Sequence, residues 1–148
     1  MVEFRETNNN ISLEEIKKFE MDNNLELTEK YKEFLLKCNG GKVKPNVFLI
    51  SKEQGESVLS IFFGIGDMYS NLADYIDIFE FRLPENFLPI GLDSGGNAIC
   101  LGTKTPYRDH IYFWDHEQES ETPDDMRNMY FLASDIDEFL NMLYEDDE

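Results

Sequence analysis

Residues 82–101 constrain the fold more than any other part of the chain, because they read as two short apolar strands joined by a glycine-rich turn. Pro89 restricts its own backbone and lacks an amide donor, so the strand over residues 88–92 is expected to begin a sheet or to lie at its edge. Gly95 and Gly96 accept the positive φ angles of a tight reversal, and polar neighbours can bond to the turn amides. The segment therefore predicts a β-hairpin that builds the fold and carries no evident chemistry.

The length and composition predict one domain with a substantial core. The chain has 148 residues, of which 14% are aromatic, and we expect a single domain over residues 1–148. Its core is expected at about residues 11–143, between a short flexible N-terminus and an acidic C-terminal tail. No apolar stretch is long enough to span a bilayer, and the N-terminus lacks the features of a secretory signal. Cys38 and Cys100 lie in apolar surroundings, as reduced core thiols do, so a cytoplasmic protein is expected.

The charge is strongly unbalanced. The chain has 31 acidic and 13 basic residues and a formal net charge of −18. Such a surface repels nucleic-acid backbones and anionic membranes and attracts a basic protein. Acidity can also serve solubility alone, and the composition does not decide between these two roles. From residue 115 to the end, however, thirteen acidic residues stand against one basic residue, Arg127, so the charge is concentrated.

Two helices are expected in the first part of the chain. Ser12 and Glu15 have the spacing of a capping box, which predicts a helix over residues 13–21. Thr28 is expected to cap a second helix, whose apolar residues recur at the i, i+3, i+4, i+7 spacing. The glycines of the Asn39-Gly40-Gly41 sequence predict the end of this helix.

Strand and helix patterns then follow in a mixed order. Apolar runs at residues 47–50 and 58–65 predict an antiparallel pair, and Asp67 is expected to open a third helix. Further strands are expected at residues 110–114 and 129–132, before a closing helix capped by Ser134. Because the strands cluster in hairpins, we expect an α+β fold in which a mainly antiparallel, twisted sheet of about five or six strands packs with about four helices.

With these elements placed, the chain resembles the SUKH superfamily of Smi/Knr-type domains. Three segments carry the resemblance: YKEFL running into NGG at residues 31–41, the hairpin LPENFLPIGLDSGGNAICL at residues 83–101, and IYFWDHE at residues 111–117. The resemblance covers roughly residues 11–143. Leu27-Thr28 departs from the Leu-Pro that often precedes the second helix, but Thr28 can cap that helix equally well.

The resemblance implies a function class as well as a fold. Bacterial members are mostly immunity proteins that bind and neutralise an exported toxin domain, often a nuclease. Eukaryotic members are regulatory scaffolds that bind cellular partners, which is the alternative function here. Neither group is known for catalysis, so no enzyme activity, cofactor or metal is expected.

A metal or acid–base site is a third hypothesis, after the immunity protein and the regulatory scaffold. His110 and His116 are the only histidines, and both have acidic neighbours. On an extended strand, residues six apart are separated by roughly 20 Å, too far to share an ion. Their neighbours also alternate between the two faces of the strand, so surface or turn positions are the better interpretation.

The acidic stretch that follows residue 114 is the candidate binding site. Nuclease domains are basic where they bind phosphates, so a cluster of carboxylates with adjacent aromatic residues suits a basic toxin domain. Trp114 can equally belong to the core, since strand alternation alone does not establish exposure. The predicted partner-binding residues are Tyr112, Trp114, Asp115, Glu117, Glu119, Glu121, Asp124 and Asp125.

Overall fold

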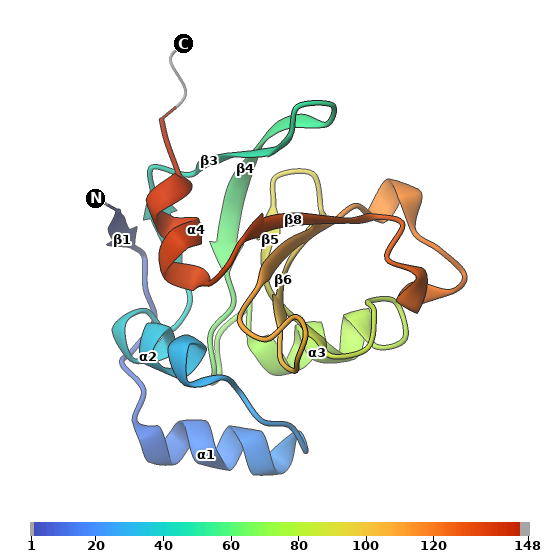
Figure 1. The fold of residues 1–148 in the computed structure, drawn as a ribbon. Coiled ribbons are helices and arrows are strands. Elements are labelled where there is room, and N and C mark those ends of the chain that lie inside the picture. The colour runs from blue at the N-terminus through green and yellow to red at the C-terminus, as the bar shows by residue number, and fades with distance from the viewer. Residues whose placement is uncertain (1, 146–148) are drawn as a thin grey trace.

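The computed structural model describes residues 2–145, which form a small two-stranded sheet, a six-stranded sheet and four helices (Figure 1). The strands are β1 (Glu3–Arg5), β2 (Lys42–Lys44), β3 (Val47–Ser51), β4 (Gly55–Phe62), β5 (Phe87–Asp93), β6 (Ala98–Gly102), β7 (Ile111–Trp114) and β8 (Met129–Ala133). The helices are α1 (Leu13–Asp22), α2 (Glu29–Lys37), α3 (Leu72–Phe79) and α4 (Ile136–Met142), with two 3₁₀ turns, η1 (His116–Gln118) and η2 (Pro123–Asp125). The predicted α+β class is confirmed.

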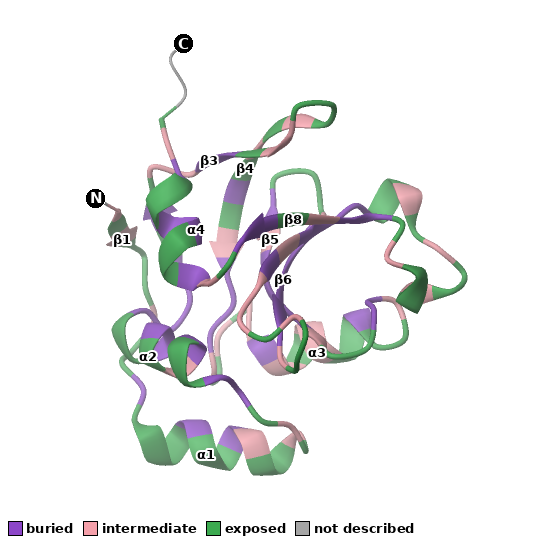
Figure 2. Ribbon diagram, viewed as in Figure 1, coloured by how far each residue is buried: buried purple, intermediate pink, exposed green. Residues whose placement is uncertain are grey.

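The large sheet has the order β3-β4-β5-β6-β7-β8, and every neighbouring pair is antiparallel. Both of its faces are covered around β6, which is buried along its whole length (Figure 2). Ile99 and Leu101 belong to the larger core, which also contains residues of α1, α2 and α4. Ala98 and Cys100 belong to a smaller core with Phe79 at the end of α3. The hairpin at residues 82–101 thus lies at the centre of the molecule.

The two N-terminal helices begin as predicted. Ser12 completes its capping box with Glu15, and the Thr28 side chain accepts a hydrogen bond from the Tyr31 amide. The other two starts were predicted wrongly. Helix α3 begins after Asn71, whose side chain accepts from the Asp74 amide, and not at Asp67. Helix α4 is capped by Asp135, whose carboxylate accepts from the Glu138 amide at 2.8 Å, and not by Ser134.

The position of Pro89 also differs from the prediction. Strand β5 lies inside the sheet, between β4 and β6, and neither begins the sheet nor forms its edge. The register with β6 shifts between Pro89 and Gly91, and the paired residues of β4 reach only as far as Gly91. A proline without an amide donor is therefore accommodated at a bulge.

Two further boundaries differ. Strand β4 begins at Gly55, so the loop after β3 is shorter than the predicted residues 51–57. The N-terminus, expected to be flexible, contains β1, which pairs antiparallel with β2. Part of the acidic tail, residues 146–148, lies outside the described residues.

The side chain of Asn39, just after the end of α2, is hydrogen-bonded to two other segments of the chain. Its side-chain amide is buried and donates to the carbonyls of Asn9, at 3.1 Å, and Ile65, at 2.9 Å, while its Oδ1 accepts from the Ile65 amide at 2.8 Å. Gly64 passes so close that a Cβ atom there would lie 2.4 Å from the Asn39 carbonyl oxygen. Asn39 therefore joins the N-terminal segment, the end of α2 and the segment after β4.

We predict that Asn39→Ala destabilises the fold by about 2–4 kcal/mol, because it removes a buried side chain and three part-buried hydrogen bonds to the backbone of Asn9 and Ile65. Urea denaturation monitored by circular dichroism measures this change in the free energy of unfolding. The matched control is Asn10→Ala at an exposed position, which is expected to change stability by less than about 0.5 kcal/mol. Equal losses in the two variants would contradict the role assigned to Asn39.

Candidate protein-binding surface

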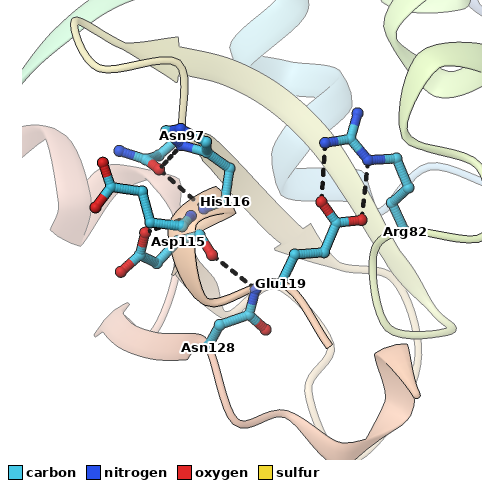
Figure 3. Close-up of polar contacts among 7 residues, drawn as sticks. Arg82, Asn97, Asp115, His116, Glu119 and Asn128 are labelled. Carbon is cyan, nitrogen blue, oxygen red and sulfur yellow. Dashed lines mark hydrogen bonds and ion pairs between the residues drawn. The ribbon is translucent and has the colours of Figure 1, made fainter. Parts of the chain in front are cut away.

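The acidic loop (residues 115–128) connects β7 to β8 and is closed at its base by two buried residues. The Asp115 amide donates to the Asn128 carbonyl at 3.0 Å, and the Asn128 side chain donates to the Asp115 carbonyl at 2.8 Å (Figure 3). The Asp115 carboxylate accepts from the Glu117 amide at 3.0 Å and from Gln118 Nε2 at 2.7 Å. Asp115 is therefore a helix cap within the loop.

The β5–β6 turn holds the start of the acidic loop. Asn97 Oδ1 accepts a hydrogen bond from the His116 amide at 2.9 Å, and it also contacts His116 Nδ1 (Figure 3). Because Oδ1 is the acceptor for the amide, Nδ1 carries a proton in this pair. Of the polar neighbours expected to bond to the turn amides, Asp93 accepts from the amides of Gly95 and Asn97, whereas the Asn97 side-chain oxygen accepts from the His116 amide.

Arg82 holds the middle of the acidic loop. Its guanidinium makes a two-fold contact with Glu119, from Nη2 at 3.0 Å and from Nε at 3.1 Å (Figure 3). The same group lies 5.2 Å from the ring centroids of Phe79 and Trp114, so the arginine connects the smaller core to the loop. Trp114 is 1% exposed and packs in that core. Of the two positions that the sequence left open, core and surface, Trp114 therefore occupies the core.

Two carboxylates order the tip of the acidic loop. Asp124 accepts from the Glu85 amide at 2.6 Å, which connects the tip to the segment before β5. Asp125 accepts from Ser120 Oγ and from the Arg127 amide. The hydrogen bond from Ser120, followed by that from the amide, lowers the pKa of the Asp125 carboxyl.

The eight predicted site residues therefore fall into separate groups. Glu117 and Glu121 are exposed, and within the described residues their carboxylates make no hydrogen bond or ion pair. Glu119, Asp124 and Asp125 are exposed but already engaged within the chain. Trp114 and Asp115 are buried, in contrast to the exposure that a partner contact requires, and we leave both out of the proposed surface.

Tyr112 lies in an aromatic cluster rather than on the loop. Its ring makes edge contacts with Phe87, Tyr107 and Phe131, with ring centroids between 5.2 and 5.8 Å apart. Burial, and after it the neighbouring Tyr107, raise the pKa of the Tyr112 hydroxyl. Phe131 is 50% exposed, so the cluster reaches the surface.

The two histidines have separate surroundings. The His110 ring packs against Phe131, with centroids 5.5 Å apart, whereas His116 is bonded to Asn97. Within residues 2–145, no group of three or more His, Cys, Asp or Glu side chains is placed to hold a metal ion. In the same part of the chain, no helix is long and apolar enough to cross a membrane.

Comparison of the sequence with known proteins gives one relative and one family. A protein of Bacillus subtilis (strain 168), the SPbeta prophage-derived uncharacterized protein YokK, is 27% identical over 150 aligned positions, which cover 90% of this chain and 74% of that protein. The family model of the SMI1 / KNR4 family (SUKH-1) matches residues 10–142, nearly the whole chain. The chain therefore belongs to the SMI1 / KNR4 family (SUKH-1).

Proposed function

We propose that this chain is a cytoplasmic, non-catalytic immunity protein that binds and neutralises a basic toxin domain, of nuclease type, through its acidic loop. The observation that carries the proposal is the fixed shape of the loop. Arg82, Asn97 and Asn128 bond to it from outside or from its base. The side chains of Glu117 and Glu121 are exposed and, among the described residues, make no hydrogen bond or ion pair.

A preformed acidic surface suits the capture of a basic protein. Ordering a flexible loop on binding opposes association, and a loop already held by hydrogen bonds avoids much of that entropy loss. The net charge of −18 attracts a basic partner over distances longer than the contact itself, which raises the association rate at low salt. A nuclease domain, which needs cationic side chains to hold phosphates, has the complementary charge.

The alternative is a regulatory scaffold that binds cellular proteins through the same loop. The gene neighbourhood separates the two, because an immunity protein is expected beside a gene for a large exported protein with a variable C-terminal domain. Co-expression of that C-terminal domain with this chain tests neutralisation directly. Restored growth of cells carrying the toxin domain supports immunity, and continued killing contradicts it.

We predict that the double variant Glu117→Lys, Glu121→Lys weakens binding to the toxin domain by at least about tenfold and reduces its salt dependence, because it reverses the two unpaired carboxylates. Titration calorimetry at low and at physiological salt measures both effects. The control with the same net charge is Glu14→Lys, Glu33→Lys, at exposed positions of α1 and α2. If both double variants lose affinity equally, the contribution is only that of total charge and the acidic loop is not the binding site.

We also predict that Arg82→Met loosens the acidic loop. The variant loses the two-fold contact with Glu119, so loop amides are expected to exchange with deuterium faster, and the free energy of unfolding is expected to fall by about 1 kcal/mol. Binding to the toxin domain should weaken although no contact carboxylate has changed. Arg108→Met is the control, because Arg108 is exposed and makes only a long 3.4 Å hydrogen bond to the Thr103 carbonyl among the described residues. Unchanged exchange in the Arg82 variant would refute the proposed ordering of the loop.

A further inference from the structure

An open groove of about 1480 Å³ lies between the C-terminal half of α1, the C-terminal end of α3 and residues 83–89. In Figure 1, α1 lies at the bottom of the view and α3 lies above it to the right. Pro123 and Asp124 of the acidic loop also line the groove, so the two surfaces are continuous. A single partner can therefore contact both.

Two large apolar side chains at this groove are exposed to solvent. Phe81 is 85% exposed and Met21 is 75% exposed, and both belong to the groove lining. Neither side chain contributes much buried surface to the fold. Apolar side chains in such positions are typical anchors for a partner.

The backbone at Phe81 makes its exposure more informative. The Arg82 amide donates to the Phe79 carbonyl at 3.0 Å, which closes a turn with Phe81 at its third position. Glu80 has φ −57° and ψ 133°, and Phe81 has φ 66°, the values of a type II turn. Glycine is the usual residue at that position, because a bulky side chain is strained at positive φ.

The next turn along the chain has asparagine, and not an aromatic residue, at the position of positive φ. The Phe87 amide donates to the Pro84 carbonyl at 3.3 Å, and the residue with positive φ is Asn86, at 70°. Asparagine tolerates this conformation far better than phenylalanine does. The positive φ of Phe81 therefore destabilises the fold, and its exposed ring buries almost no apolar surface in exchange. Stability of the fold alone does not explain a phenylalanine at this position.

The groove lining is acidic as well as apolar. It contains seven carboxylate side chains and two lysines. Four of these acids, Glu26, Asp77, Glu80 and Glu85, are exposed, and across residues 2–145 their side chains make no hydrogen bond or ion pair. A basic segment satisfies such a rim, whereas an acidic or purely apolar segment leaves the carboxylates uncompensated.

We propose that this groove docks a basic polypeptide segment of the partner, with one large apolar side chain against Phe81 and Met21 and flanking lysines or arginines against Glu80 and Glu85. The inference rests on the proposed function for the partner's basic character and adds a second contact beside the acidic loop. Phe81 acts as the apolar anchor, and the rim carboxylates give the preference for positive charge.

The test uses the full chain and a fluorescein-labelled peptide of alternating lysine and serine with one central tryptophan, followed by fluorescence polarisation. We expect Phe81→Gly to weaken peptide binding by about tenfold while raising the thermal midpoint by about 1–3 °C, because glycine relieves the positive φ. Glu80→Gln, Glu85→Gln should also weaken binding and reduce its salt dependence. Tyr69→Ser, at an aromatic residue that is 96% exposed outside the groove, is the control and should change neither property.

Several outcomes would overturn the groove proposal. These are no measurable binding of the peptide, equal binding by the wild-type chain and Phe81→Gly, or a fall in the thermal midpoint with binding unchanged. Amide chemical shifts of the isotope-labelled chain locate the peptide, and changes confined to residues 115–121 would also overturn it. The proposed function is judged separately by co-expression with the toxin domain, so either proposal can fail alone.

Discussion

The buried carboxylate of Asp93 is the constraint on which the central part of the structure depends. It is 5% exposed and accepts four hydrogen bonds, from Ser57 Oγ, from the amides of Gly95 and Asn97, and from the Asn97 side chain. A charge buried in this way is tolerated only when donors surround it. The hydrogen bonds to the Asp93 carboxylate shape the β5–β6 turn and join it to β4. They also orient the Asn97 side chain toward His116. The start of the acidic loop thus depends on a residue that is itself buried.

Local patterns predicted the fold where the deciding interactions are local. The caps at Ser12 and Thr28 involve neighbours three residues away, and both were identified correctly. The start of α4 was missed by one residue because Ser134 and Asp135 are both good caps, and only the geometry distinguishes them. Pro89 was misplaced for a different reason. A proline in a strand is compatible with a strand start, a sheet edge or a bulge, and the neighbouring strands, which the sequence of β5 does not identify, decide between them.

The sequence predicted an acidic loop, but it did not predict which of the loop carboxylates bond within the chain and which remain exposed. Glu119 and Asp124 are engaged by Arg82 and by the Glu85 amide, which are 37 and 39 residues away in the chain. No spacing rule connects such positions. Trp114 remained open between core and surface, since alternation along a strand identifies a face and not what covers it. Here the end of α3 covers it, and Arg82 lies above the ring.

The frame of the acidic loop has a consequence for how this scaffold can change. Its shape is maintained by Asp115 and Asn128 at the base and by Arg82 and Asn97 from outside. Within residues 2–145, the side chains of Glu117 and Glu121 make no hydrogen bond or ion pair that would hold it. Substitutions at the latter two positions therefore leave the frame intact and cost little stability. On the proposed binding surface, the residues that hold the loop in shape are therefore different from the exposed carboxylates, so substitutions that change the preference for a partner need not change the fold.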